Sequence, residues 1–173
     1  MRGPHHLYVM RHAHTEPGRS GISDKARELS AAGLGQIRNL SRCLDKQGYA
    51  IEQAFVSTAT RTQQSHKALG RIAREKRDIE LLYHCNTIEL NTLIEKACCH
   101  SLLIVGHNPV LSDWLLAMTN LCEVKLGGAA DYLPFFDMSP ATFVALERQH
   151  SDYVLRQFWT VNKDAKVSLQ CFR

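Results

Sequence analysis

The sequence has no long hydrophobic run, no paired-cysteine motif and no strong bias in charge. Its apolar stretches are far shorter than the roughly 20 residues that a helix needs to cross a bilayer. The first of them ends at Arg11, so the amino-terminal segment also lacks the form of a secretory signal. We therefore expect a protein without a membrane span and with a cytoplasmic location.

The charge balance excludes little but favours one class of ligand. A net charge of +4 and a pI near 8.8 are mildly basic, which suits anionic ligands without indicating nucleic acid. The 173 residues, of which 45% are hydrophobic, are enough for the core of one domain. The chain also lacks internal repeats, low-complexity tracts and linkers, so we expect a single domain over residues 1–173.

The six cysteines do not indicate a disulfide framework. Their spacings are irregular, none forms a CxxC pair, and a domain of this size needs no covalent bridge. We interpret them as buried, reduced thiols. A redox role for the adjacent pair Cys98 and Cys99 is the alternative.

Short apolar runs alternate with segments of helical periodicity through most of the chain. The expected strands cover residues 7–10, 51–56, 79–83, 101–105, 142–146 and 153–159. The expected helices cover residues 30–48, 58–73, 86–97 and 110–118, with a loop over 127–140. This alternation predicts an α/β fold: a three-layer α/β/α sandwich whose central sheet is mostly parallel and ends in an antiparallel strand pair.

A basic run, "RIAREKR" at residues 71–77, closes the second expected helix. It could form an anion-binding patch. We favour a solvated helix end, where cations complement the negative end of the helix dipole.

Arginine and histidine follow three of the expected strands. Arg11 and His12 end the first strand, Arg61 follows the second, and His107 follows the fourth. In open α/β sheets, ligands bind beyond the carboxyl ends of the strands, so we expect these side chains to converge. Arginine makes forked hydrogen bonds to phosphoryl oxygens, and a neutral histidine can attack phosphorus. A second, protonated histidine could then neutralise charge on the phosphoryl oxygens without a metal or another cofactor.

The motifs at these strand ends resemble the histidine phosphatase superfamily, and more closely its SixA-type phosphohistidine phosphatases. The likeness runs from about residue 7 to 114 and depends on the order and spacing of "MRHAHTEPG", "SDKARELSAAG", "FVSTATRTQQS", "LYHCNTIEL" and "LLIVGHNPVLSDW". The resemblance implies a phosphoglycerate mutase-like fold and a phosphatase. Its substrate would be a phosphohistidine-bearing protein domain or, alternatively, a small phosphorylated molecule.

The resemblance also implies roles for particular residues. His12 would be the phosphorylated nucleophile, Arg11 and Arg61 would hold the phosphoryl oxygens, and His107 would face the same group. Arg27, in "ARELS", is a weaker candidate for phosphate contact.

Two departures from the superfamily's patterns bear on the reaction. Ala13 and His14 stand where the mutase branch has glycine and glutamate, which argues against mutase activity. The superfamily's general acid follows the third strand, where Glu89 and Glu95 are available without a clear motif. A weak acid suits phosphohistidine, whose P–N bond breaks without strong proton donation.

The segment between the third and fourth strands is too short to form a lid over the site. An open site suits a phosphoryl group carried on another protein.

Two further interpretations stay open. His12 and His14 form an HxH pair that could ligate a metal, although no cysteine or carboxylate cluster completes such a site and Arg11 would repel a cation. The pocket could also bind a phosphorylated partner without turnover, although all four motif residues are present. Four other histidines lack such a context, and we interpret them as ordinary: His66, His84, His100 and His150.

Overall fold

The computed structural model describes residues 3–119, 138–150 and 152–172. Its strands are β1 (His6–Arg11), β2 (Ile51–Ser57), β3 (Ala73–Ile79), β4 (Ser101–Gly106), β5 (Phe143–Gln149), β6 (Asp152–Val161) and β7 (Val167–Cys171). Its α-helices are α1 (Ala31–Gln47), α2 (Thr60–Ala68), α3 (Thr87–Glu95) and α4 (Val110–Met118). Two short 3-10 helices are η1 (Asp24–Ala26) and η2 (Glu80–Tyr83).

These strands form one sheet in the order β3-β2-β4-β1-β5-β6-β7. The first four strands in this order run parallel to one another, whereas β5, β6 and β7 continue the sheet in antiparallel pairings. The predicted α/β sandwich is confirmed. The antiparallel section has one strand more than expected, because β7 was not predicted.

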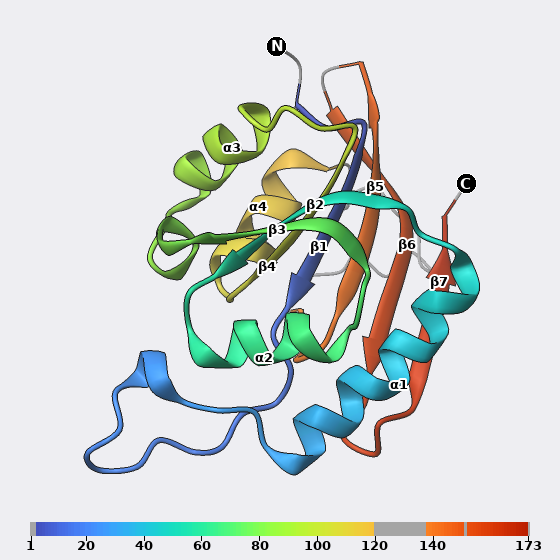
Figure 1. The fold of residues 1–173 in the computed structure, drawn as a ribbon. Coiled ribbons are helices and arrows are strands. Elements are labelled where there is room, and N and C mark those ends of the chain that lie inside the picture. The colour runs from blue at the N-terminus through green and yellow to red at the C-terminus, as the bar shows by residue number, and fades with distance from the viewer. Residues whose placement is uncertain (1–2, 120–137, 151, 173) are drawn as a thin grey trace.

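Both faces of the sheet are covered, and β1 contributes to both cores. Helices α3 and α4 lie on one face of the sheet, and α1 and α2 lie on the other (Figure 1). Leu7 and Val9 belong to the core cluster that includes residues of α3 and α4, whereas Tyr8 and Met10 belong to the cluster that includes residues of α1. This follows from the alternation of side chains along a strand. Full burial of one such apolar side chain contributes about 1.5–3 kcal/mol, so β1 is held firmly at the centre of the sheet.

Helix α1 begins and ends where the sequence indicates. The Ser30 side chain accepts a hydrogen bond from the Gly33 amide, and Gly48 ends the helix with a φ of 67°. Gly33 also lets the helix approach the segment after β1 closely, since a Cβ there would lie 2.0 Å from the His14 carbonyl oxygen. The start of α1 is therefore packed directly against the chain that follows His12.

Of the two elements expected between β2 and α3, the helix is confirmed but is shorter than expected, and the strand is wrong. The helix predicted over 58–73 ends at Ala68, and Gly70 has a φ of 75°, which turns the chain out of the helix. The basic run then enters β3 and is not a helix end. The strand predicted over 79–83 is instead η2.

Both misread regions lie at the border of the sheet. β3 is an edge strand whose residues are mostly exposed, so it has no buried face to give an alternating pattern. Charged side chains on an edge strand also oppose pairing with other chains. The cysteine prediction is wrong in part, because Cys98 and Cys171 are exposed, while Cys122 lies outside the described residues. Most of the predicted loop 127–140 also lies outside them.

No helix within the described ranges is long and apolar enough to cross a membrane.

Candidate active site

The carboxyl ends of three adjacent strands bring the sequence-predicted residues together. The sheet order places β4 between β2 and β1, and Arg11 pairs with Gly106 in the β1–β4 ladder. His12 and His107 each follow directly on their strand. Their ring centroids are 5.2 Å apart.

The backbone and the ring of His12 are both fixed. Its amide donates to the Gly106 carbonyl at 3.1 Å, and its carbonyl accepts from the Ala141 amide at 3.1 Å. Its Nδ1 lies 2.7 Å from the Ala13 carbonyl oxygen. Because a carbonyl oxygen only accepts hydrogen bonds, Nδ1 carries the proton, and Nε2 of the neutral ring holds a lone pair.

The surroundings keep the His12 ring neutral. Burial, together with repulsion from Arg61, Arg11 and Arg27, lowers its pKa to about 4, against the opposing effect of the hydrogen bond to Ala13. At neutral pH the Nε2 lone pair is therefore available. A neutral ring among three cations can act as a nucleophile toward an anion that the cations attract.

His107 is also neutral in this structure. Burial, with further contributions from His12 and Arg61, lowers its pKa to about 3. Burial, with the nearby charges of Arg61 and Arg11, therefore opposes the expected protonation of this second histidine in the protein alone, and only the Asp24 carboxylate favours it. The ring is 2.9 Å from the Ser57 hydroxyl through Nε2, and its buried Nδ1 has no partner among the described residues.

Arg61 lies in the site and forms a salt bridge with Asp24, a residue that was not predicted from the sequence. Its side chain is 8% exposed, and its guanidinium donates to the Asp24 carbonyl at 2.6 Å and to the Asp24 carboxylate at 3.0 Å. The Tyr83 hydroxyl donates to the same carboxylate at 2.9 Å. Hydrogen bonds from Arg27, Tyr83 and Arg61 lower the pKa of Asp24 to about 2, so this carboxylate is ionised and orients Arg61.

Arg27 is held in the loop that follows His12. It donates to the Thr15 hydroxyl at 2.7 Å, to the Glu16 carbonyl at 2.9 Å and to Asp24 at 3.0 Å. Its charge is close enough to lower the pKa of His12. Its contact with phosphate stays a prediction.

Tyr83 borders the site and was also missed. Its ring meets that of His107 edge to face at 5.6 Å between centroids, and the guanidinium of Arg61 lies 5.8 Å from its centre. Tyr83 is the last residue of the third expected strand but is neither an arginine nor a histidine, and Asp24 lies at no expected strand end. The one available signal for Asp24 was its place three residues before Arg27 in "SDKAR".

Glu89 has a local structural role. Its carboxylate accepts a hydrogen bond from the Asn86 amide at 2.9 Å, and the Asn86 side chain accepts from the Glu89 amide, which forms a capping box at the start of α3. Its assignment as a general acid stays a prediction, and this contact does not support it.

The HxH metal interpretation gains no support from the geometry. The His14 ring lies 2.8 Å from the Ser30 hydroxyl, and its amide donates to the Gln36 side chain. Within the described part of the chain, the group of side chains that could hold a metal lies elsewhere and includes neither His12 nor His14.

Comparison with known proteins supports the fold. A provisionally named phosphohistidine phosphatase SixA from Agrobacterium tumefaciens superposes with a TM-score of 0.76 at 23% identity, over 91% of this chain and 99% of that one. A protein histidine phosphatase SixA complexed with tungstate has a TM-score of 0.60 at 17% identity, over 95% and 94%. A phosphoserine phosphatase from Entamoeba histolytica has a TM-score of 0.56 at 16% identity, over 91% and 98%. No protein-family model and no curated protein sequence matches the chain. The chain therefore has the histidine phosphatase fold that its motifs imply.

Proposed function

We propose that this protein is a phosphatase that removes the phosphoryl group from phosphohistidine on a partner protein, through a covalent intermediate on His12. The observation that carries the proposal is the state of His12. Its Nδ1 is hydrogen-bonded to the Ala13 carbonyl, and burial, together with the charges of three nearby arginines, lowers its pKa to about 4. A neutral nucleophile in a cationic pocket is what attack on a phosphoryl dianion requires.

The reaction has two transfers. In the first, Nε2 of His12 forms a bond to phosphorus while the P–N bond of the substrate breaks. His12 keeps its Nδ1 proton, and the departing imidazole takes up a proton from solvent water. In the second, water attacks the phosphoryl group on His12, releasing inorganic phosphate and one proton and restoring the neutral ring. Arg11 and Arg61 stabilise the charge on the phosphoryl oxygens in both steps.

The acids near the site favour a substrate whose leaving group needs little help. Asp24 is held ionised by its partners, so it has no proton to give near neutral pH. Glu89 is occupied at the start of α3. Imidazole leaves phosphorus more easily than an alkoxide, so a P–N substrate fits these surroundings better than a phosphate ester. The names of the SixA structures with the same fold support this choice.

Phosphate release from three substrates tests the proposal: a phosphohistidine-bearing protein domain, a phosphoserine peptide and an aryl phosphate. We expect the first to be hydrolysed with a kcat/KM at least about tenfold above the others. Preference for a small ester would instead indicate a small-molecule phosphomonoesterase. Tight binding of the phosphorylated domain without phosphate release would indicate a binding module.

A further inference from the structure

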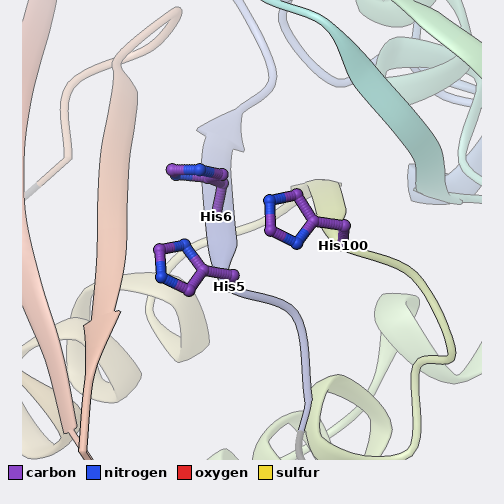
Figure 2. Close-up of side chains that lie close together, drawn as sticks. All are labelled: His5, His6 and His100. Carbon is purple, nitrogen blue, oxygen red and sulfur yellow. The ribbon is translucent and has the colours of Figure 1, made fainter.

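Three histidines gather at the end of the sheet opposite to the candidate active site. His5 immediately precedes β1, His6 is its first residue, and His100 immediately precedes β4 (Figure 2). One ligand nitrogen from each ring lies within 4.8 Å of the others. The ring centroids are 4.6 Å apart for His5 and His6, and 5.2 Å apart for each of the two pairs that include His100. We call these residues the amino-end cluster.

The backbone holds the cluster in place. The amides of His5 and His6 both donate to the His100 carbonyl, at 2.9 and 3.0 Å. The His100 amide donates in turn to the Glu52 carboxylate at 2.8 Å. The three Cα positions are therefore fixed by the β1–β4 pairing.

The side chains, in contrast, are available. His5 and His100 are exposed and His6 is half-buried. No hydrogen bond engages their ring nitrogens in the part of the chain that the structure describes, and the rings instead face one another (Figure 2). The ring nitrogens already lie within 4.8 Å of one another, so rotation of the exposed rings, of which His5 and His100 are stacked, would turn their lone pairs toward a shared space.

We propose that the amino-end cluster binds a divalent transition-metal ion of the Zn²⁺ class. Neutral imidazole is a preferred ligand of Zn²⁺, Co²⁺, Ni²⁺ and Cu²⁺. Tetrahedral coordination at about 2.1 Å needs ligand nitrogens about 3.4 Å apart, which rotation of the exposed rings can reach. Water fills the fourth position.

The charges around the cluster favour a cation. Glu147 faces His6 in the β1–β5 ladder, and both residues line the same surface hollow. Arg156 neutralises Glu147 in part, at 2.7 Å. Glu52 adds a second carboxylate next to His100. The neighbouring Arg148 guanidinium is paired with Glu95.

The ion would stabilise the fold and take no part in phosphoryl transfer. His12 lies six residue steps of about 3.3 Å after His6, so the two sites are about 20 Å apart. A bound ion links the residues before β1 to the start of β4, and it shifts the folding equilibrium because the unfolded chain does not hold the three rings together. This proposal departs from the expectation that the chain has no metal site, and it stands independently of the proposed phosphatase activity.

Titration of the tag-free, chelator-treated protein with Co²⁺ and Zn²⁺ tests it. We expect one ion per chain, with visible Co²⁺ bands of a tetrahedral nitrogen and oxygen site and no thiolate charge-transfer band. His100→Ala and His5→Ala should each weaken Zn²⁺ binding by more than about 100-fold, since loss even of an outer-shell partner costs 10- to 100-fold. Zn²⁺ at about 100 times Kd should raise the Tm of the parent by roughly 5 °C or more and leave that of His100→Ala unchanged.

Three control variants separate this site from others. His150→Asn replaces an exposed histidine outside the cluster with a residue that tolerates its positive φ of 58°. The double variant Cys98→Ser and Cys99→Ser removes the thiols next to His100, and His12→Ala removes the active-site histidine. All three should bind Zn²⁺ as the parent does. Equal affinity in His100→Ala and the parent, or a thiolate charge-transfer band, would overturn the proposal.

Discussion

Strands β1 and β4 carry histidines at both ends, and the two ends differ in their surroundings. At the carboxyl end, the rings of His12 and His107 lie among arginines, and their pKa values are lowered to about 4 and about 3. At the amino end, the cluster is more exposed and lies beside Glu52 and Glu147. The same residue type therefore stands in surroundings that favour an anion at one end of the sheet and a cation at the other. Arginine neighbours attract an anion and repel a cation, and carboxylate neighbours do the reverse.

Removal of the nucleophile should have the largest effect. His12→Ala should lower kcat on a phosphohistidine protein by at least about 10⁴-fold, because the covalent step has no other acceptor at that position. The side chain is not fully buried, so the fold should survive. Circular dichroism and phosphate release measure the two outcomes. If His12→Ala kept a tenth of the activity, the nucleophile would have to be another residue.

Removal of an arginine should have the second largest effect on activity. Arg61→Ala should lower kcat/KM by about 10²-fold, or roughly 3 kcal/mol, on the scale of one lost charge-stabilising donor. Arg61→Lys should keep only part of the parent's kcat/KM, because an ammonium group cannot make the forked contact. Tungstate should inhibit the parent more strongly than Arg61→Ala. Equal inhibition would show that the oxyanion binds away from Arg61.

Removal of the carboxylate that orients Arg61 should have a smaller effect on kcat. Asp24→Asn should lower kcat by roughly tenfold, on the scale of a lost orienting partner. Tungstate binding should stay equal or become tighter, because a negative charge leaves an anion site. Equal weakening of kcat and of tungstate binding would mean that Asp24 supports the whole pocket and not the direction of one guanidinium.

The pH dependence of folding stability should show that the fold keeps His107 neutral. Between about pH 6.5 and pH 4, His12 and His107 take up protons in the unfolded chain but not in the folded one, so folding stability falls as pH falls. His107→Asn should reduce this fall, as measured by the urea midpoint at pH 7 and at pH 4.5. An identical fall in the parent and the variant would mean that His107 is not held neutral by the fold.

Chelation should have the smallest effect on activity. Because the two sites are about 20 Å apart, removal of metal should leave kcat/KM within about twofold while lowering Tm in the parent. Phosphate release after chelator treatment, with and without added Zn²⁺, measures the effect on kcat/KM. A large loss of activity that Zn²⁺ restores would place a metal in the chemistry.

The sequence predicts the buried part of the molecule well. The strands at 7–10, 51–56 and 101–105 and the helices after Ser30 and Asn86 are confirmed, because burial and capping leave local patterns. β3 and β7 were missed because edge strands have little or no buried face. The convergence of Arg11, His12, Arg61 and His107 followed from the strand ends alone.

What the sequence did not indicate depends on contacts between distant segments. Asp24 and Tyr83 reach Arg61 across the chain, and no spacing rule relates these three positions. The amino-end cluster exists only because β1 and β4 pair, so His100 was interpreted as ordinary. A histidine before each of two strands is a signal only once the strands are known to be neighbours.

Trapping the intermediate tests the central claim most directly. Rapid quench of the protein with a labelled phosphohistidine substrate should yield a phosphoryl-enzyme that is labile in acid and stable in base, and mass spectrometry of the stabilised peptide should place the label on His12. The label should be absent in His12→Ala and present in the control His150→Asn. Labelling of His12→Ala to the same extent as the parent would contradict the account. Turnover of the parent without any labelled protein during the reaction would contradict it as well.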